Sequence, residues 1–223
     1  MAEDINFDFA RRERIGLSEA VYCESKSVEQ IAATLAAVVT KGESVLLTRL
    51  AASQVENLSP QLRARLDYDS LSRTAIFGDW RAPQSAPQVA LVTAGSSDLR
   101  VAREAGRTLA FNGINAAEFN DVGVAGLWRL LERAEELRRF PVVIAVAGME
   151  GALFSVIGGL VGGLLIALPT SVGYGVTGGG ITALHAALGS CAPGVVTVNI
   201  DNGYGAACAA LRALRMQDGL AQR

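Results

Sequence analysis

The sequence is poor in the residues that build metal sites and disulfide frameworks. Its 223 residues include one histidine, His185, and three cysteines, Cys23, Cys191 and Cys208. A single histidine argues against a metal centre made of imidazole ligands. Three scattered cysteines without a CxxC pair argue against a disulfide framework or a zinc motif. Charge is also scarce, at 19% of residues with a formal net charge of −2, so we expect no nucleic-acid partner.

Two further absences concern secretion and membranes. The first residues, MAEDINFDFARRER, lack an apolar core, so we expect no signal peptide and a cytoplasmic protein. Residues 151–169 carry no charge and approach the length of a membrane span. Two Gly-Gly pairs and the lack of a flanking basic cluster favour instead a short helix and a short strand of a buried sheet. We therefore expect no membrane partner.

A change of composition near residues 78–88, with two prolines and little periodicity, indicates a linker between two domains. Residues 1–80 are expected to form a small amino-terminal α/β domain, and residues 81–223 a larger one. In the small domain the pattern predicts a helix over 27–39, a strand over 44–49, a helix over 51–65 and an extended stretch over 66–77.

The larger domain has a regular alternation of apolar runs and helical patterns. Its expected strands are VALVTAG, INAAEFND, PVVIAVAG, LLIALPT and VVTVNID, and each is followed by a helix. Five βα units in order predict an α/β fold with a doubly wound, five-stranded parallel sheet of the flavodoxin or Rossmann type.

Polar residues follow these strands, and parallel sheets bind ligands outside the carboxyl ends of their strands. Small, hydroxylated and acidic residues gather at these ends, and the helix N-termini there favour anions such as phosphate. The candidate site residues at this edge are Ser96, Ser97, Asp98, Asp121, Ser171, Tyr174, Asp201 and Asn202. The GSSD turn at 95–98 is explained equally by helix capping. No GxGxxG follows the first strand, so the dinucleotide fingerprint is absent.

Glu150 is the one charge between Arg139 and Asp201. It either complements a helix N-terminus or lies in an apolar environment that suits it to acid–base catalysis. The loop PTSVGYGVTGGG, 169–180, is either a flexible turn or a ligand loop.

Cys191 precedes the fifth expected strand, at the edge opposite the carboxylates. As an isolated residue it is either a small apolar filler or a nucleophile. If it is a nucleophile, either a second subunit brings it to the acidic edge or the helix–strand boundary near 189–195 is misplaced.

The run of motifs GSSD, DVGVAG, VAGMEGAL, PTSVGYG, SCAPG and VNIDNGYGAA resembles the pyridinium-3,5-biscarboxylic acid mononucleotide synthase family of nickel-pincer nucleotide biosynthesis. The resemblance covers residues 78–210 and extends more faintly to residues 14–31, where Lys26 matches a lysine of the family. The carboxy-terminal half of the sequence is also similar to aminoimidazole ribonucleotide carboxylases. Those enzymes carry a histidine after the third strand, where this sequence reads AGMEGALF.

The resemblance implies carboxylation of nicotinic acid adenine dinucleotide by CO₂ through a Cys191 adduct, with hydrolysis of the phosphoanhydride. It implies roles for Glu150 and Asp98 in taking the ring proton or ordering the substrate, and a substrate-binding role for Lys26. It also implies that the other candidates at the strand ends bind the nucleotide phosphates, the ribose or the carboxylates of the substrate. It further implies Mg²⁺ on the substrate phosphates, a homo-oligomer with composite active sites, and a part in lactate racemase maturation.

The sequence departs from the family at Trp128, Phe154 and Gly189, and Ser25-Lys26-Ser27 replaces a more usual Gly-Lys-Thr. Two alternatives stay open. One is a purine-type carboxylase or mutase, which the missing histidine disfavours. The other is a nucleotide-binding module without catalysis.

Overall fold

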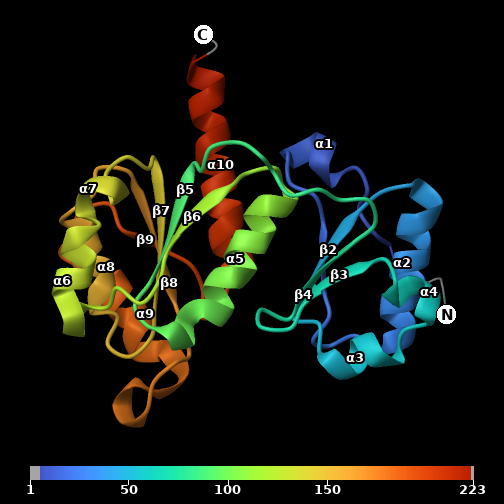
Figure 1. Ribbon diagram of the computed structural model, residues 1–223, viewed down its shortest axis with the longest axis horizontal. Helices are drawn as coiled ribbons and strands as arrows, with labels where there is room; N and C mark the ends of the chain where they lie inside the picture. Colours follow the sequence, from blue (N-terminus) through green and yellow to red (C-terminus); the bar gives the residue numbers. More distant parts are fainter. Residues whose placement is uncertain (1–5, 222–223) are drawn as a thin grey trace. The chain divides into compact units, whose positions relative to one another are not determined.

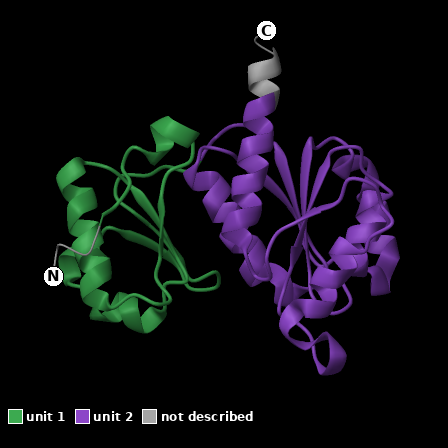
Figure 2. Ribbon diagram, turned by 180° about the vertical axis from the view of Figure 1, so that it is seen from behind, with its two compact units in different colours: residues 1–82 green, residues 83–223 purple. Residues whose placement is uncertain are grey.

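The computed structural model describes residues 6–221, with side chains up to Met216. The chain divides into two compact units, residues 1–82 and 83–223 (Figure 2). Within the described residues, no helix combines the length and the apolar character that a membrane span needs.

The first unit contains a four-stranded mixed sheet with the strand order β1-β2-β4-β3. β1 pairs with β2 in parallel, and β4 pairs antiparallel with both β2 and β3. Ile31, Leu35 and Val38 of α2 pack with Leu47 and Phe77 of the sheet in one buried cluster. The elements are α1 (Arg11–Ile15), β1 (Ala20–Tyr22), α2 (Val28–Lys41), β2 (Val45–Thr48), α3 (Ala52–Asn57), α4 (Pro60–Arg63), β3 (Leu66–Asp69) and β4 (Thr74–Phe77).

Two expectations for this unit were too coarse. The extended stretch 66–77 is a hairpin, because Asp69 accepts hydrogen bonds from the amide and the hydroxyl of Ser72 and so closes a turn. The single helix expected over 51–65 is two short helices, since Ser59 caps a new helix with Pro60 at its first position.

The second unit is a five-stranded, wholly parallel sheet with the order β6-β5-β7-β8-β9 (Figure 1). This confirms the expected doubly wound α/β fold. The elements are β5 (Val89–Thr93), α5 (Leu99–Phe111), β6 (Ala116–Phe119), α6 (Leu127–Glu132), α7 (Ala134–Leu137), β7 (Val142–Ala147), α8 (Ala152–Gly158), β8 (Leu164–Pro169), α9 (Ile181–Leu188), β9 (Val196–Thr197) and α10 (Gly203–Ala221), with 3₁₀ turns at Ser96–Asp98, Val124–Gly126 and Gly175–Gly180.

Helices cover both faces of this sheet. α5 and α10 pack together on one face, and α6, α7, α8 and α9 lie on the other (Figure 1). All residues of β5 and β7 are buried, as expected for strands covered on both sides. The charge-free stretch 151–169 is accordingly a short helix, α8, followed by the strand β8.

Two elements differ from the sequence expectation. The helix expected after the second strand is broken into a 3₁₀ turn, α6 and α7. The fifth strand, expected over 195–201, is reduced to Val196–Thr197. Asn199 leaves the ladder because its side chain accepts from the amide of Ile200, so its backbone turns locally.

Candidate functional site

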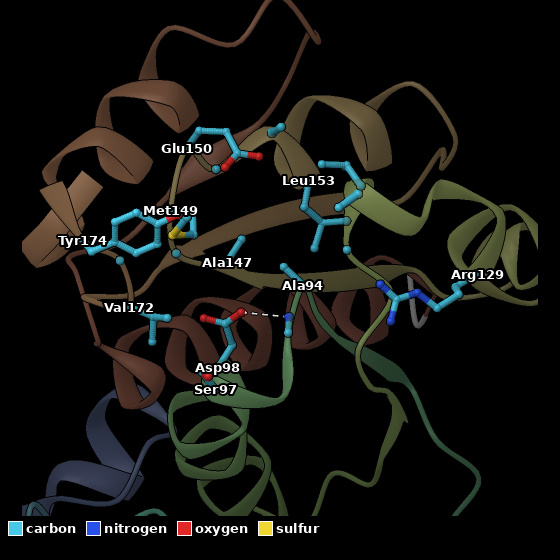
Figure 3. A pocket seen from close by; sticks show the side chains of 18 residues that line it. Ala94, Ser97, Asp98, Arg129, Ala147, Met149, Glu150, Leu153, Val172 and Tyr174 are labelled. Carbon is cyan, nitrogen blue, oxygen red and sulfur yellow. Dashed lines mark hydrogen bonds between the residues drawn. The ribbon is translucent and has the colours of Figure 1, made fainter. Parts of the chain in front are cut away.

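A cavity of about 580 Å³ opens at the carboxyl edge of the parallel sheet, where β5 and β7 end. The chain leaves β5 toward β6 on one side and returns to β7 on the other, so this is the topological switch point of the sheet. The walls are largely apolar, with Ala94, Ala147, Leu153 and Val172 among the lining residues. Figure 3 shows Tyr174 and Arg129 approaching from opposite sides of this cavity.

The end of β7 and the loop after β8 lie close together at the base of the cavity. A Cβ at Gly148 would lie 2.2 Å from the carbonyl oxygen of Val172 and 2.7 Å from the Thr170 hydroxyl. Only glycine therefore lets the end of β7 pass beside the loop after β8. The amide of Met149 donates to that same Val172 oxygen at 2.7 Å, which fixes the two segments together.

Asp98 is the buried carboxylate of the site. Its side chain accepts a hydrogen bond from the Thr170 hydroxyl at 2.7 Å and from the amide of Gly95 at 3.0 Å, the bond drawn in Figure 3. Burial raises the pKa of Asp98 above its ordinary value, although the hydrogen bonds from Thr170, Gly95 and Gly148 oppose that rise. Asp98 thus joins the ends of β5, β7 and β8.

Glu150 lies on the cavity wall, but the apolar environment expected for it is wrong. Its side chain is exposed. Met149 and Gly151, on either side, both have left-handed backbone conformations, with φ of 50° and 67°. These two residues turn Glu150 away from the core, so its carboxylate is exposed at the rim of the cavity.

Asp201 forms a second polar network at this edge, outside the residues that line the cavity. It accepts from the amide and hydroxyl of Ser171, at 2.9 and 2.7 Å, and pairs with Arg100 at 3.2 Å. Burial opposes the charge of Asp201, but the Ser171 hydrogen bonds and the Arg100 guanidinium outweigh it and lower the pKa. The side chain of Asn202 accepts from the amide of Gly205 and so caps α10.

The structure therefore separates the expected site residues into groups. Ser97, Asp98, Glu150 and Tyr174 line the cavity. Ser96 is exposed beside them, and Asp121, Ser171, Asp201 and Asn202 surround the cavity at the same edge without lining it. Lys26 belongs to the first unit, where it lines a separate cavity of about 250 Å³ with Phe7, Glu19 and Tyr22.

Sequence reasoning missed Arg129, the cation among the described residues that line the main cavity. It lies in the first turn of α6, and its guanidinium forms an ion pair of 2.6 Å with Asp121. Its place just after the second strand of a parallel sheet was the available signal, since such helices begin at the ligand edge.

Cys191 lies between α9 and β9, before the strand and hence at the amino edge of the sheet. The helix ends at Leu188, earlier than expected, but Cys191 still precedes the fifth strand, and its thiol does not line the cavity of its own chain. Its loop is anchored by the Ser155 and Ser190 hydroxyls, 2.8 Å apart, and by the amide of Ala192, which donates to Ser190. Cys191 is exposed.

The thiol of the first unit is unsuited to catalysis. Cys23 is fully buried in the core of the first unit. Burial raises the pKa of its thiol to about 12, so the reactive thiolate form is absent at neutral pH. Of these two thiols, Cys191 is the exposed one.

The donor atoms of this edge do not form a preformed metal site. No group of three or more histidine, cysteine, aspartate or glutamate side chains within the described residues is arranged to hold an ion. The oxygens of Asp98 already accept protein hydrogen bonds. These residues do not fit a resident Mg²⁺, and we derive no step through one.

Fold and cavity together define an α/β protein with its ligand site at the switch point of a parallel sheet. Family comparison specifies the class further. Residues 2–79 match the LarB/PurE-like N-terminal domain, and residues 88–223 match AIR carboxylase. The chain belongs to the AIR carboxylase family in the two-domain form of LarB, which confirms the resemblance to the pyridinium-biscarboxylic acid mononucleotide synthases.

These two domains indicate carboxylase-type activity in the family. The chain is also 37% identical over 213 residues to the uncharacterized protein MJ0165 of Methanocaldococcus jannaschii. That similarity covers 92% of this chain and 81% of the relative.

Proposed function

We propose that this protein carboxylates the pyridinium ring of nicotinic acid adenine dinucleotide with CO₂ and hydrolyses the phosphoanhydride. The products are pyridinium-3,5-biscarboxylic acid mononucleotide and AMP. The observation that carries the proposal is the pairing of an apolar cavity, flanked by a tyrosine and an arginine, with an exposed cysteine on an anchored loop.

The thiol is needed to make the pyridinium ring nucleophilic. A pyridinium ring is electron-poor and does not attack CO₂. Addition of the Cys191 thiolate to the ring carbon para to nitrogen forms a C–S bond and places the displaced electron pair in a neutral enamine. The adjacent ring carbon then attacks CO₂ and forms the new C–C bond. Loss of the proton on that carbon and cleavage of the C–S bond restore the aromatic cation and the thiolate.

Each remaining cavity residue has a role that its surroundings support. Tyr174, with 76% of its surface exposed, offers a face on which the cationic ring stacks. Glu150 is exposed at the rim and takes the ring proton. Asp98 is held by three strand ends and orders the substrate rather than exchanging protons with it.

The positions of Cys191 and the cavity are the reason for proposing a composite site. In one chain Cys191 and the cavity lie at opposite edges of the sheet. We therefore propose a homo-oligomer in which Cys191 of one copy reaches the cavity of another. Any Mg²⁺ that assists hydrolysis is held mainly by the phosphates of the substrate.

The test is product mass. The purified protein is incubated with nicotinic acid adenine dinucleotide, bicarbonate and Mg²⁺, and the products are followed by mass spectrometry. We expect AMP and a mononucleotide that has gained one carboxylate. Cys191→Ala abolishes that gain, a loss of about a thousandfold or more, whereas the matched control Cys208→Ala retains it.

Two outcomes contradict the proposal. Full turnover in Cys191→Ala means that the reaction does not use this thiol. Dinucleotide binding without any product in the unaltered protein favours a nucleotide-binding module without catalysis.

A further inference from the structure

More acidic than basic side chains line the main cavity. Among its described lining residues, Asp98 and Glu150 are acidic and Arg129 is basic. Arg129 lies across the cavity from Tyr174 (Figure 3). A flat ring stacked on the tyrosine would therefore turn one edge toward the guanidinium.

The guanidinium of Arg129 already holds a carboxylate in this structure. Its Nη1 lies 2.6 Å from Oδ2 of Asp121. The Asp121 side chain is 57% exposed and that of Arg129 is 32% exposed. Ion pairs in contact with water are weak and exchange readily, so another carboxylate can displace Asp121.

The backbone around this pair is fixed, which leaves only the two side chains to move. The amide of Asp121 donates to the Thr93 hydroxyl at 3.0 Å. A Cβ at Gly123 would lie 2.5 Å from the Ala94 carbonyl oxygen, so this loop is pressed against the end of β5. A Cβ at Gly126 would lie 2.7 Å from Nε of Arg129, so the loop also leaves space for the guanidinium.

We propose that Arg129 recognises the carboxylate on the pyridinium ring, and that Asp121 occupies the guanidinium until that carboxylate displaces it. This inference rests on the proposed function. A ring carboxylate offers two oxygens to the planar guanidinium fork. A ring carboxamide is neutral and offers one acceptor oxygen beside an NH₂ donor, so it cannot fill the guanidinium fork with two acceptors and does not displace the charged Asp121. The pair thus selects the acid dinucleotide over the amide dinucleotide.

The test measures equilibrium binding of nicotinic acid adenine dinucleotide and nicotinamide adenine dinucleotide by calorimetry. All proteins carry Cys191→Ala and bicarbonate is omitted, so neither a covalent adduct nor turnover contributes. The background protein is expected to prefer the acid. Arg129→Gln reduces that preference by about tenfold or more.

Asp121→Asn separates the two roles of the pair. The change removes the competing charge, and asparagine tolerates the left-handed backbone at this position, where φ is 57°. We expect the acid to bind up to about fivefold more tightly, with the affinity for the amide unchanged. Glu118→Gln removes an exposed carboxylate from the same edge strand and is expected to alter neither affinity. In Arg129→Gln, adding Asp121→Asn has no further effect.

Each other outcome overturns the inference. Equal losses of both dinucleotides in Arg129→Gln mean that the arginine binds a phosphate. Weaker acid binding in Asp121→Asn means that Asp121 is itself a ligand. Binding of both dinucleotides without preference rejects the inference alone, whereas failure of both to bind rejects the proposed function as well.

Discussion

The two edges of the five-stranded sheet differ in what they present to a ligand. The carboxyl edge holds a cavity of about 580 Å³ with Asp98, Glu150, Tyr174 and Arg129 on its walls. The amino edge near β9 holds the exposed thiol of Cys191 on a loop anchored by Ser190. One edge therefore has the proposed substrate cavity, and the other has the proposed nucleophile.

This separation shows that the chain alone does not assemble the proposed chemistry. The distance is set by the fold, because every strand is parallel and the loops before and after a strand lie at opposite ends. Symmetric association of identical chains brings opposite edges of two copies together without changing either fold.

The amino edge can be altered without touching the cavity. A Cβ at Gly158 of α8 would lie 2.6 Å from the Cβ of Ala192, next to Cys191. Gly158→Ala therefore displaces the thiol loop by a fraction of an ångström or more. We expect turnover to fall by about a hundredfold, while the affinity for nicotinic acid adenine dinucleotide, measured by calorimetry, stays unchanged.

The neighbouring glycine provides the matched control. At Gly159 a Cβ would have its nearest contact at 3.6 Å, with the carbonyl oxygen of Val156, so Gly159→Ala retains both binding and turnover. If Gly158→Ala weakens binding as much as turnover, the two edges are not independent and the comparison fails.

Within the carboxyl edge, two carboxylates respond to pH in opposite directions. Asp201 has a lowered pKa, so it adds stability above the pKa of an unfolded aspartate, near 4, and loses that contribution as the pH falls. Asp98 has a raised pKa, so its contribution to stability is present below the pKa of an unfolded aspartate. That contribution is lost as the pH rises through the pKa of Asp98 in the folded state.

Asparagine variants separate these contributions in urea unfolding between pH 3 and 7. Asp201→Asn is expected to cost about 2 kcal/mol at pH 7, because it removes charged hydrogen bonds, and much less at pH 3. In the unaltered protein, Asp98 lowers the free energy of unfolding as the pH rises, and Asp98→Asn is expected to abolish that decline. Parallel pH curves for both variants and the unaltered protein would mean that neither carboxyl is perturbed by folding.

Much of the second unit could be predicted from its sequence. Strands buried on both faces are continuous apolar runs, and VALVT, VVIAVA and LLIALP are such runs between turn signals. The polar turns after them locate the ligand edge, and the loop before β9 locates Cys191. The strand order could not be predicted in this way, because doubly wound parallel sheets occur with more than one order, and the structure selects β6-β5-β7-β8-β9.

The rest depends on contacts that no local pattern encodes. Glu150 has apolar neighbours in sequence, yet left-handed residues on both sides turn it to solvent. Arg129 reaches the cavity only because Gly123 lets the preceding loop press on Ala94. The sequence places Asp121 at the ligand edge, but it does not indicate the ion pair that Asp121 forms with that arginine.

The most direct measurement of the central claim is complementation between two inactive variants. Cys191→Ala and Glu150→Gln are co-expressed with different tags, and the mixed oligomers are purified through both tags. If the thiol of one copy serves the cavity of another, the share of sites that combine an intact cysteine with an intact glutamate is half in a mixed dimer and about a quarter in a large, randomly mixed oligomer, and that share of carboxylation returns. Mixed oligomers as inactive as their parents would show that one chain must supply both residues, which contradicts the account.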